Sequence, residues 1–362
     1  MSAPLSRPGI MDINPYKGGE SAIPGVSRII KLASNEGALG PSPRAMEAYR
    51  RLAADLHRYP DGGADQLRRA IADHHGLDVE RIVCGAGSDE LITLLCRAYV
   101  GPGEEILYSR HGFLMYAINA KAVGATSVTA PESNLTADVD ALLAAVTPRT
   151  RICFLANPNN PTGTYIPAKE VKRLRAGLPD HVILAIDAAY AEFVRRDDYS
   201  AGAELVEAGT NTVMLRTFSK LYALGGLRLG WGYFPTAVAD VMHRVRNPFN
   251  VSSAAQKAGL AALADTAYAE LCRGHNDYWL SWFSGQVREM GLEAVPSVGN
   301  FVLIRFPAEP ARDSAAADRF LRSRGIIARA VAGYGLGEYL RVTIGKDDEM
   351  REAAAALRDF MG

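Results

Sequence analysis

The sequence has no excess of charge of either sign, because 40 Lys and Arg residues balance 40 Asp and Glu residues. Nucleic-acid-binding proteins normally carry a basic patch that neutralises phosphates, so this class of function is disfavoured. No stretch approaches the length of a membrane span, and the N-terminal residues lack the apolar segment of a signal peptide. We therefore expect a soluble, cytoplasmic protein that binds neither nucleic acid nor membrane.

Cysteine is also scarce, and Cys84, Cys96, Cys153 and Cys272 are widely spaced. Three of them lie in apolar runs, which is typical of small core residues rather than disulfide partners or zinc ligands. The HExxH pattern of metal hydrolases and the GxSxG pattern of serine hydrolases are both missing. We therefore predict no metal site and neither kind of hydrolase.

The chain does contain a regular alternation of short apolar runs and helical stretches. The apolar runs cover residues 81–84, 105–108, 151–155, 182–186, 213–215 and 229–233. Strands that alternate with helices predict an α/β fold with a mostly parallel sheet covered on both faces. Ligands of such sheets bind beyond the carboxyl ends of the strands, so we expect the site there.

Length and composition divide the chain into an arm and two domains. The 362 residues exceed what one hydrophobic core usually serves. Residues 1–35 are rich in Pro and Gly and are predicted to form an N-terminal arm. Residues 36–250 carry the alternating pattern and form the predicted large domain. A long alanine-rich helix then introduces a smaller α/β domain over residues 251–362.

Lys220 is the most informative residue. It follows the apolar run 213–215 in the motif Thr217-Phe218-Ser219-Lys220, and Arg228 comes eight residues later. An amine at the end of a buried strand, beside hydroxyls and an arginine, suits a lysine held next to a bound phosphate. The alternative is a lysine in an exposed loop, as most lysines are. This segment alone does not separate the two.

A turn at residues 85–88 offers a place for the phosphate. It lies between a strand and a helix, so free backbone N–H groups and the positive end of the helix dipole would face an anion. A dinucleotide-binding fingerprint would need a third glycine where Glu90 stands, so that reading fails on its spacing. Ser88 is a suitable helix N-cap with or without a phosphate.

Asp187 and Arg341 are charged residues that lie at the end of an apolar run or inside one. Asp187 ends the run 182–186, where an unpaired carboxylate would be costly to bury, although an aspartate at a strand end is more often a cap or turn residue. Arg341 lies within the apolar run 340–344, and a buried guanidinium needs an anion. Both side chains therefore suggest charged ligands.

Together, Ala86-Gly87-Ser88-Asp89-Glu90, Asn157 to Gly163, Asp187-Ala188-Ala189-Tyr190, Lys220 and Arg341 resemble the motifs of class I and II pyridoxal-phosphate aminotransferases of fold type I. The resemblance extends over nearly the whole chain. It implies a large domain with a mostly parallel seven-stranded sheet flanked by helices, and a smaller α/β C-terminal domain. It also implies pyridoxal 5′-phosphate as the cofactor.

The resemblance assigns roles around that cofactor. Lys220 would bind it covalently and then carry a proton at the substrate, with Asp187 on the pyridinium nitrogen. Tyr190 and Asn160 would contact the phenolic oxygen, and Phe113 would stack on the ring in place of the more common tyrosine. The residues implied for the phosphate and its surroundings are Ala86, Gly87, Ser88, Thr217, Ser219 and Arg228.

The resemblance also concerns the substrate and a second subunit. Arg341 would bind the substrate's anionic group, and Arg329 would be a second anion contact or a surface ion-pairing residue. Tyr16 in the arm and Asn35 would contact substrate, although Ser34-Asn35-Glu36-Gly37 departs from the usual Asn-Glu-Asn-Pro. Tyr59 would reach the cofactor phosphate of a neighbouring subunit, which implies a homodimer with shared active sites.

Within the family, the likeness is greatest to the branch that transfers an amino group from L-histidinol phosphate to 2-oxoglutarate. An aminotransferase for aromatic amino acids is the nearest alternative, because Arg329 and Arg341 would suit a carboxylate as well as a phosphate. A phosphothreonine-type decarboxylase on the same fold is a second. A transcription regulator is disfavoured, because no helix-turn-helix module fits before Ser42.

Overall fold

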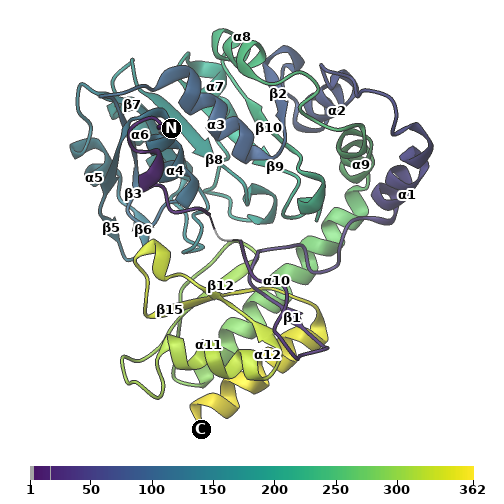
Figure 1. Cartoon of the computed structure of the whole chain (residues 1–362), viewed down its shortest axis with the longest axis vertical. Coiled ribbons are helices and arrows are strands. Elements are labelled where there is room, and N and C mark those ends of the chain that lie inside the picture. The colour runs from purple at the N-terminus through teal and green to yellow at the C-terminus, as the bar shows by residue number, and fades with distance from the viewer. Residues whose placement is uncertain (1–3, 17) are drawn as a thin grey trace.

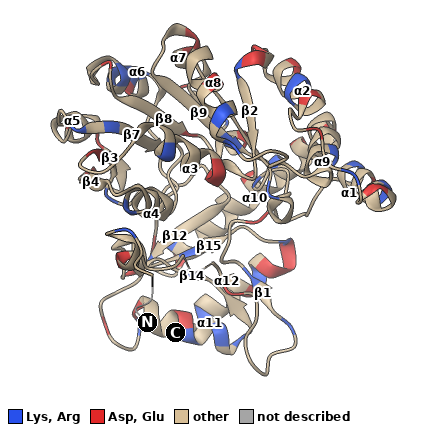
Figure 2. Ribbon diagram, turned by 45° about the horizontal axis from the view of Figure 1, so that its top comes forward, with Lys and Arg blue, Asp and Glu red and all other residues tan. Residues whose placement is uncertain are grey.

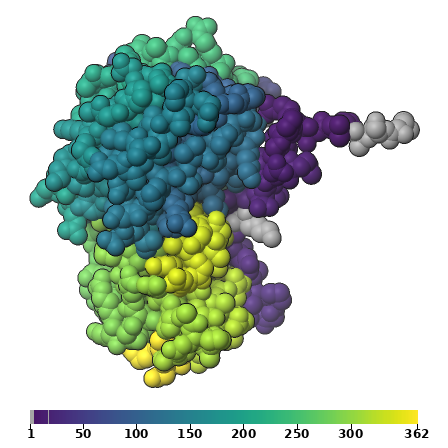
Figure 3. All heavy atoms as spheres, turned by 90° about the vertical axis from the view of Figure 1, so that its left-hand side faces the viewer, coloured from purple at the N-terminus to yellow at the C-terminus, as the bar shows by residue number. Residues whose placement is uncertain are grey.

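The computed structural model describes residues 4–16 and 18–362, which form a large lobe and a smaller lobe (Figure 1). Lysine, arginine, aspartate and glutamate are interspersed over both lobes (Figure 2). The first residues that the structure describes, from Pro4 onward, project from the body (Figure 3), and Leu5 is 97% exposed. Among the described residues, no helix has both the length and the apolar character needed to cross a membrane.

The large lobe is built on a seven-stranded sheet, as predicted. Its order is β2 (Ile82–Gly85), β10 (Gly230–Tyr233), β9 (Thr212–Thr217), β8 (Ile183–Asp187), β7 (Thr150–Ala156), β3 (Glu105–Ser109) and β4 (Thr126–Ala130). The strands from β9 to β4 are parallel to one another, and β10 is antiparallel to both of its neighbours. The sequence pattern missed β4, because an edge strand reading TSVTA has no apolar run.

Helices cover both faces of this sheet. One face packs against α3 (Ser88–Tyr99), α4 (Leu114–Val123) and α8 (Thr236–Val245). The other packs against α2 (Asp65–His75), α5 (Val139–Ala144), α6 (Ala168–Gly177), α7 (Ala203–Ala208) and α9 (Ser253–Ala264). Two hydrophobic layers therefore fix the strand ends that carry the polar motifs.

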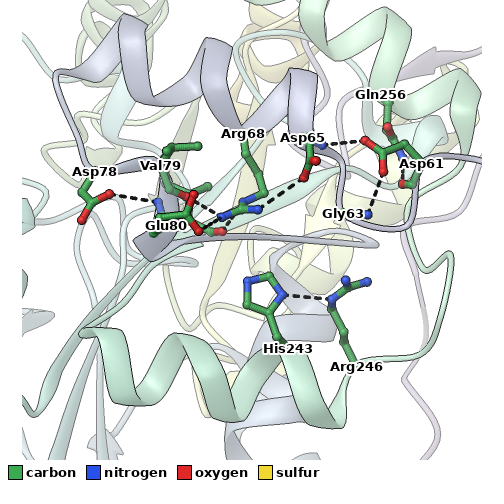
Figure 4. Close-up of polar contacts among 11 residues, drawn as sticks. Asp61, Gly63, Asp65, Arg68, Asp78, Val79, Glu80, His243, Arg246 and Gln256 are labelled. Carbon is green, nitrogen blue, oxygen red and sulfur yellow. Dashed lines mark hydrogen bonds and ion pairs between the residues drawn. The ribbon is translucent and has the colours of Figure 1, made fainter.

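Arg68 on α2 holds the segment that leads into β2, and its contacts with Asp65, Val79 and Glu80 are drawn in Figure 4. Arg68 on α2 is buried, and its Nε donates to the Ile82 carbonyl at 2.8 Å while Nη2 donates to the Val79 carbonyl at 2.7 Å. These bonds hold the start of β2 and the short helix η3 (Val79–Arg81) against α2. The strand leads directly to the turn at residues 85–88.

The small lobe has a four-stranded antiparallel sheet in the order β11 (Glu293–Ala294), β12 (Phe301–Arg305), β15 (Tyr339–Thr343) and β14 (Arg329–Ala330). Its helices are α10 (Thr266–Glu289), α11 (Ser314–Ser323) and α12 (Asp347–Met361). A separate hydrophobic cluster, with Trp279 and Phe283 at its centre, forms its core.

The N-terminal segment joins this small lobe. The strand β1 (Ile30–Lys31) pairs in parallel with β13 (Ile326–Ile327), and Ile30 and Leu32 belong to the small lobe's core. The next helix, α1 (Pro43–Arg51), packs on α9, and the Ser42 hydroxyl caps it by accepting from the Ala45 N–H at 3.1 Å. Arg7 and Asp12 contact α4 of the large lobe, so the described chain runs from the large lobe to the small lobe at β1 and returns to the large lobe at α1.

The three predicted domain ranges, 1–35, 36–250 and 251–362, stay a prediction. Ala255, Ala258 and Ala262 of α9 pack into the core of the large sheet, whereas α10 contributes Trp279 to the small core. We propose a boundary near Asp265, where α9 ends and α10 begins. The remaining elements are η1 (Ile10–Asp12), η2 (Leu52–Asp55), η4 (Ala191–Phe193), η5 (Gly225–Leu227), η6 (Ala332–Tyr334) and the hairpin of β5 (Glu132–Ser133) and β6 (Thr136–Ala137).

Candidate active site

A cavity of about 310 Å³ lies where the carboxyl ends of β7, β8 and β9 meet the small lobe and the N-terminal segment. All but three of the predicted site residues line it: Tyr16, Asn35, Ser88, Phe113, Asn160, Asp187, Tyr190, Thr217, Ser219, Lys220, Arg228, Arg329 and Arg341. Segments from distant parts of the chain therefore converge on one crevice, as expected for a sheet of this kind.

Ala86, Gly87 and Tyr59 are not among the residues that line the cavity. The Ala86 N–H donates to the Glu90 carboxylate at 2.6 Å, so this amide already has an anionic partner. Gly87 has a φ of +83°, and an added Cβ would lie 2.5 Å from Arg228 Nη2. Glycine is therefore needed there for Arg228 to approach the turn.

Tyr59 lies on the exposed surface of the large lobe. Its side chain is 82% exposed and stacks on Phe249, with 4.7 Å between the ring centroids. Phe249 is also exposed. Tyr59 is therefore available to a neighbouring molecule and does not contribute to the cavity of its own chain.

Asp187 is the last residue of β8 and is buried. The hydroxyl of Tyr116 donates to its Oδ2 at 2.7 Å, whereas its Oδ1 has no hydrogen-bond partner within the described part of the chain. Burial raises the pKa of Asp187 to about 6. A buried carboxylate oxygen without a donor is costly, so this atom is suited to a cationic ligand group.

Lys220 follows β9 in a short loop. Its Nζ lies 5.6 Å from the centroid of the Tyr190 ring. Among the residues described, no carboxylate lies within ion-pair distance of Lys220, so the amine is available for chemistry. The Tyr190 hydroxyl accepts from Asn35 Nδ2 at 2.8 Å, and Asn35 is itself buried. Asn35 thus positions Tyr190 beside the lysine.

Arg228 lies beside the start of α3, where it is ion-paired with Asp89. Arg228 places Nη1 3.0 Å from the Gly225 carbonyl and 3.5 Å from the Ser219 hydroxyl, and Nη2 3.2 Å from the Asp89 carboxylate. Ser88 opens the helix, so its backbone N–H is among those that a helix leaves without a partner. Helix dipole, hydroxyl and guanidinium converge as a phosphate site would require.

Arg341 is a buried cation in the wall opposite the large sheet. Its Nη1 donates to Asn160 Oδ1, its Nη2 donates to the Ala33 carbonyl at 2.8 Å, and its Nε has no partner in the described ranges. Burial lowers the pKa of Arg341. Arg329 lies nearer to solvent and donates to the Gly18 carbonyl at 2.9 Å.

Two residues of this site escaped the sequence reasoning. Tyr116 contacts Asp187 from 71 positions away, and Tyr334 lines the cavity from η6 in the small lobe. Burial raises the pKa of both phenols, so both remain protonated at neutral pH. No local pattern marks either residue, because each reaches the site through tertiary packing.

These groups fit a phosphorylated pyridine aldehyde. The start of α3 with Arg228 can hold the phosphate, the unpartnered Oδ1 of Asp187 can face the ring nitrogen, and Lys220 can bind the aldehyde. Within the same residues, no cluster of His, Cys, Asp and Glu is suited to a metal ion.

Comparison with known proteins identifies the family. The family model described as aminotransferase class I and II matches residues 27–357. The chain is 69% identical to histidinol-phosphate aminotransferase of Paramagnetospirillum magneticum over 362 residues, covering 100% of both chains. It is 60% identical to the protein of that name in Rhodospirillum rubrum, covering 99% of this chain and 97% of that protein.

Solved structures show the same fold. The crystal structure of histidinol-phosphate aminotransferase from Sinorhizobium meliloti, in complex with pyridoxal-5′-phosphate, superimposes with a TM-score of 0.91 at 30% sequence identity. The match covers 99% of this chain and 98% of that chain. The predicted α/β fold, with a large mostly parallel sheet and a smaller C-terminal unit, is confirmed.

Proposed function

The chain belongs to the class I and II aminotransferase family, and on that premise we propose that it transfers the amino group of L-histidinol phosphate to 2-oxoglutarate, with pyridoxal 5′-phosphate as cofactor. The observation that carries the proposal is the 69% identity to a histidinol-phosphate aminotransferase over the full length of both chains. The reaction belongs to histidine biosynthesis, and a cytoplasmic location suits it.

Asp187, Lys220 and Tyr190 would do the chemistry at the cofactor ring. When bound, pyridoxal phosphate supplies an aldehyde that accepts the amino group and a ring that withdraws electrons from the substrate α-carbon. Asp187 Oδ1 would hold the ring nitrogen protonated. Lys220 would hold the cofactor and move a proton at the substrate α-carbon. Asn35 donates to the Tyr190 hydroxyl at 2.8 Å and would hold that hydroxyl beside the ring.

The phosphate of the cofactor would lie at the N-terminus of α3. Ser88, Thr217 and Ser219 contribute hydroxyls to the cavity there, and Arg228 adds a guanidinium. Charge-assisted hydrogen bonds of this kind are about twice as strong as neutral ones. They would anchor one end of the cofactor and so hold the ring in one orientation relative to Lys220.

Arg341 and Arg329 would bind the anionic groups of both substrates. A guanidinium forms two parallel hydrogen bonds with either a carboxylate or a phosphate. One pocket can therefore accept the phosphate ester of the donor and a carboxylate of 2-oxoglutarate in turn. Tyr16 in the N-terminal segment lines the same cavity and would cover the bound substrate.

The proposed assembly is a homodimer with shared active sites. Its support is a group of exposed apolar side chains on α1, in the loop after η2 and in the loop before α9: Met46, Tyr49, Leu56, Tyr59 and Phe249. Clustered exposed aromatics commonly mark protein interfaces. Tyr59 would then reach the cofactor phosphate of the partner subunit.

The experiment replaces Lys220 with alanine. Borohydride reduction of the wild type loaded with pyridoxal phosphate should leave the cofactor covalently attached, as read by mass spectrometry, whereas Lys220→Ala should retain none. Turnover should fall at least about 10³-fold, because the group that moves the proton is gone. Lys172→Ala, an exposed lysine on α6, is the matched control and should behave as wild type.

Turnover of candidate donors in the wild type tests the substrate. A large preference for phenylalanine or tyrosine over L-histidinol phosphate would contradict the proposed donor and favour an aromatic amino-acid aminotransferase. Release of carbon dioxide without need of a keto acid would favour a decarboxylase instead.

A further inference from the structure

Tyr116 is held in one orientation by the aromatic rings around it. It lies on α4, is fully buried, and stacks on Phe154 with 4.4 Å between centroids and 5° between planes. Edge contacts from Tyr108, at 5.6 Å, and Phe113, at 5.9 Å, enclose the ring on further sides. The hydroxyl of Tyr116 therefore has little freedom to turn away from its partner.

That partner is the Asp187 carboxylate, 2.7 Å away. The phenol can only donate to the ionised acid, because burial and Asp187 itself raise the Tyr116 pKa well above its ordinary value. The hydrogen bond occupies Oδ2 and leaves Oδ1 as the oxygen without a partner in the described ranges. Tyr116 thus holds the Oδ2 oxygen of Asp187, and the Asp187 side chain lines the cavity.

We propose that Tyr116 is a positioning residue, which keeps Asp187 ionised and turns its Oδ1 toward the ring nitrogen of the cofactor. The inference rests on the proposed cofactor. Tyr116 does not line the cavity, so it would act on the cofactor only through Asp187.

The balance of charges around Asp187 shows why the phenol matters. Burial acts most strongly and raises the pKa of Asp187, and the hydrogen bond from Tyr116 is the largest influence that lowers it. Asp89 also raises the Asp187 pKa, while the backbone N–H of Ala189 and the charge of Lys220 lower it less. Tyr199 faces the same region but donates to the Asn157 carbonyl at 2.9 Å. Without the Tyr116 hydroxyl, the acid would be protonated closer to neutral pH and could no longer pair with a pyridinium.

The test compares two phenol deletions in the cofactor-free protein. Tyr116→Phe removes the hydroxyl bonded to Asp187, and Tyr108→Phe removes one from the same aromatic cluster that makes no hydrogen bond to Asp187. Dissociation constants are measured for pyridoxal phosphate and for its deaza analogue, in which C–H replaces the ring nitrogen. Tyr116→Phe should bind pyridoxal phosphate about tenfold more weakly, since a hydrogen bond to a charged group is lost.

The analogue separates positioning from packing. Without a ring nitrogen it gains nothing from an ionised Asp187, so its affinity should differ by less than about threefold among the wild type and both variants. The pH below which pyridoxal phosphate affinity declines should rise by about one unit in Tyr116→Phe, because a tenfold effect equals one pKa unit. Tyr108→Phe should leave that pH unchanged.

Each other outcome overturns a particular statement. Equal losses for the two ligands would show that Tyr116 only supports the packing of the site. Unchanged affinity and an unchanged pH dependence in Tyr116→Phe would show that the hydroxyl has no role. Failure of the wild type to bind pyridoxal phosphate would instead contradict the proposed function.

Discussion

Two buried arginines, one on each sheet, differ in how their charge is balanced. Arg216 on β9 lies 2.9 Å from the Glu192 carboxylate, and both side chains are at least 90% buried. Arg341 on β15 is equally buried but contacts an amide oxygen and a backbone carbonyl, with no carboxylate in ion-pair distance among the described residues. Arg216 and Glu192 therefore form a structural ion pair. Arg341 has no such partner, which suits it to binding an anionic ligand.

The pKa shifts follow the same division. Burial acts to lower the pKa of Arg216, but Glu192 outweighs it and the pKa is raised. Burial lowers the pKa of Arg341, and no acid compensates. Burying a charge without a counter-ion costs desolvation free energy, which the rest of the folded structure must offset. Such a charge is therefore better evidence for a binding site than burial or sequence position alone.

We expect the largest effect on stability when the ion pair of Arg216 and Glu192 is broken. Arg216→Met leaves Glu192 buried without a partner and should lower the free energy of unfolding by about 3–5 kcal/mol, measured by urea denaturation of the cofactor-free protein. The double variant Arg216→Met with Glu192→Leu should recover most of this loss. If Arg216→Met were as stable as the wild type, the ion pair would not contribute to the stability of the fold.

Arg341→Gln tests the other side of the comparison. Because no carboxylate is left unpaired, its free energy of unfolding should change by no more than about 1 kcal/mol. Its kcat/KM should fall about 10²–10³-fold, as expected when two charge-assisted hydrogen bonds to the substrate anion are lost. Arg324→Gln, an exposed arginine of the same lobe paired with Asp359, is the control. If Arg341→Gln lost stability but kept its activity, Arg341 would be a structural residue like Arg216.

Asp187 is a buried acid without a cationic partner, like Arg341 with the opposite charge. We expect it to have a smaller, pH-dependent effect on the free energy of unfolding. Its pKa is about 6 in the folded protein against an ordinary value of 3.8, so between these values the folded state binds more protons than the unfolded state. The free energy of unfolding should therefore fall by about 2–3 kcal/mol as the pH rises from 4 to 7. Asp187→Asn should lack this contribution, as urea denaturation of both cofactor-free proteins would show. Parallel pH dependences in the two would contradict a raised pKa.

The sequence predicted those parts of the site that depend on local position. Asp187 and Lys220 each come after a buried apolar run, and a parallel sheet brings such strand ends together, so their common position at one cavity could be predicted. Arg341 was a candidate because a charge interrupts an apolar strand. These local signals did not assign roles to the three residues, which came from the resemblance to a family.

The partners of these charges could not be predicted in the same way. Arg216 also ends an apolar run, yet its carboxylate partner is Glu192, 24 positions earlier and on another element. Tyr116 and Asp187 are 71 positions apart. The packing of α9 against the large sheet likewise depends on tertiary contacts, because an alanine-rich helix can pack on either lobe. Sequence position shows which charges are buried, and tertiary contacts decide which are neutralised.

The pairing of β1 with β13 has a consequence for biosynthesis. Ile30 and Leu32 leave the ribosome early, but β13 begins at Ile326, about 300 residues later. At the usual 5–20 residues per second, these apolar side chains wait roughly 15–60 s for their partners. The small lobe therefore closes only after β13 has been synthesised, and until then β1 remains a strand without its pairing partner.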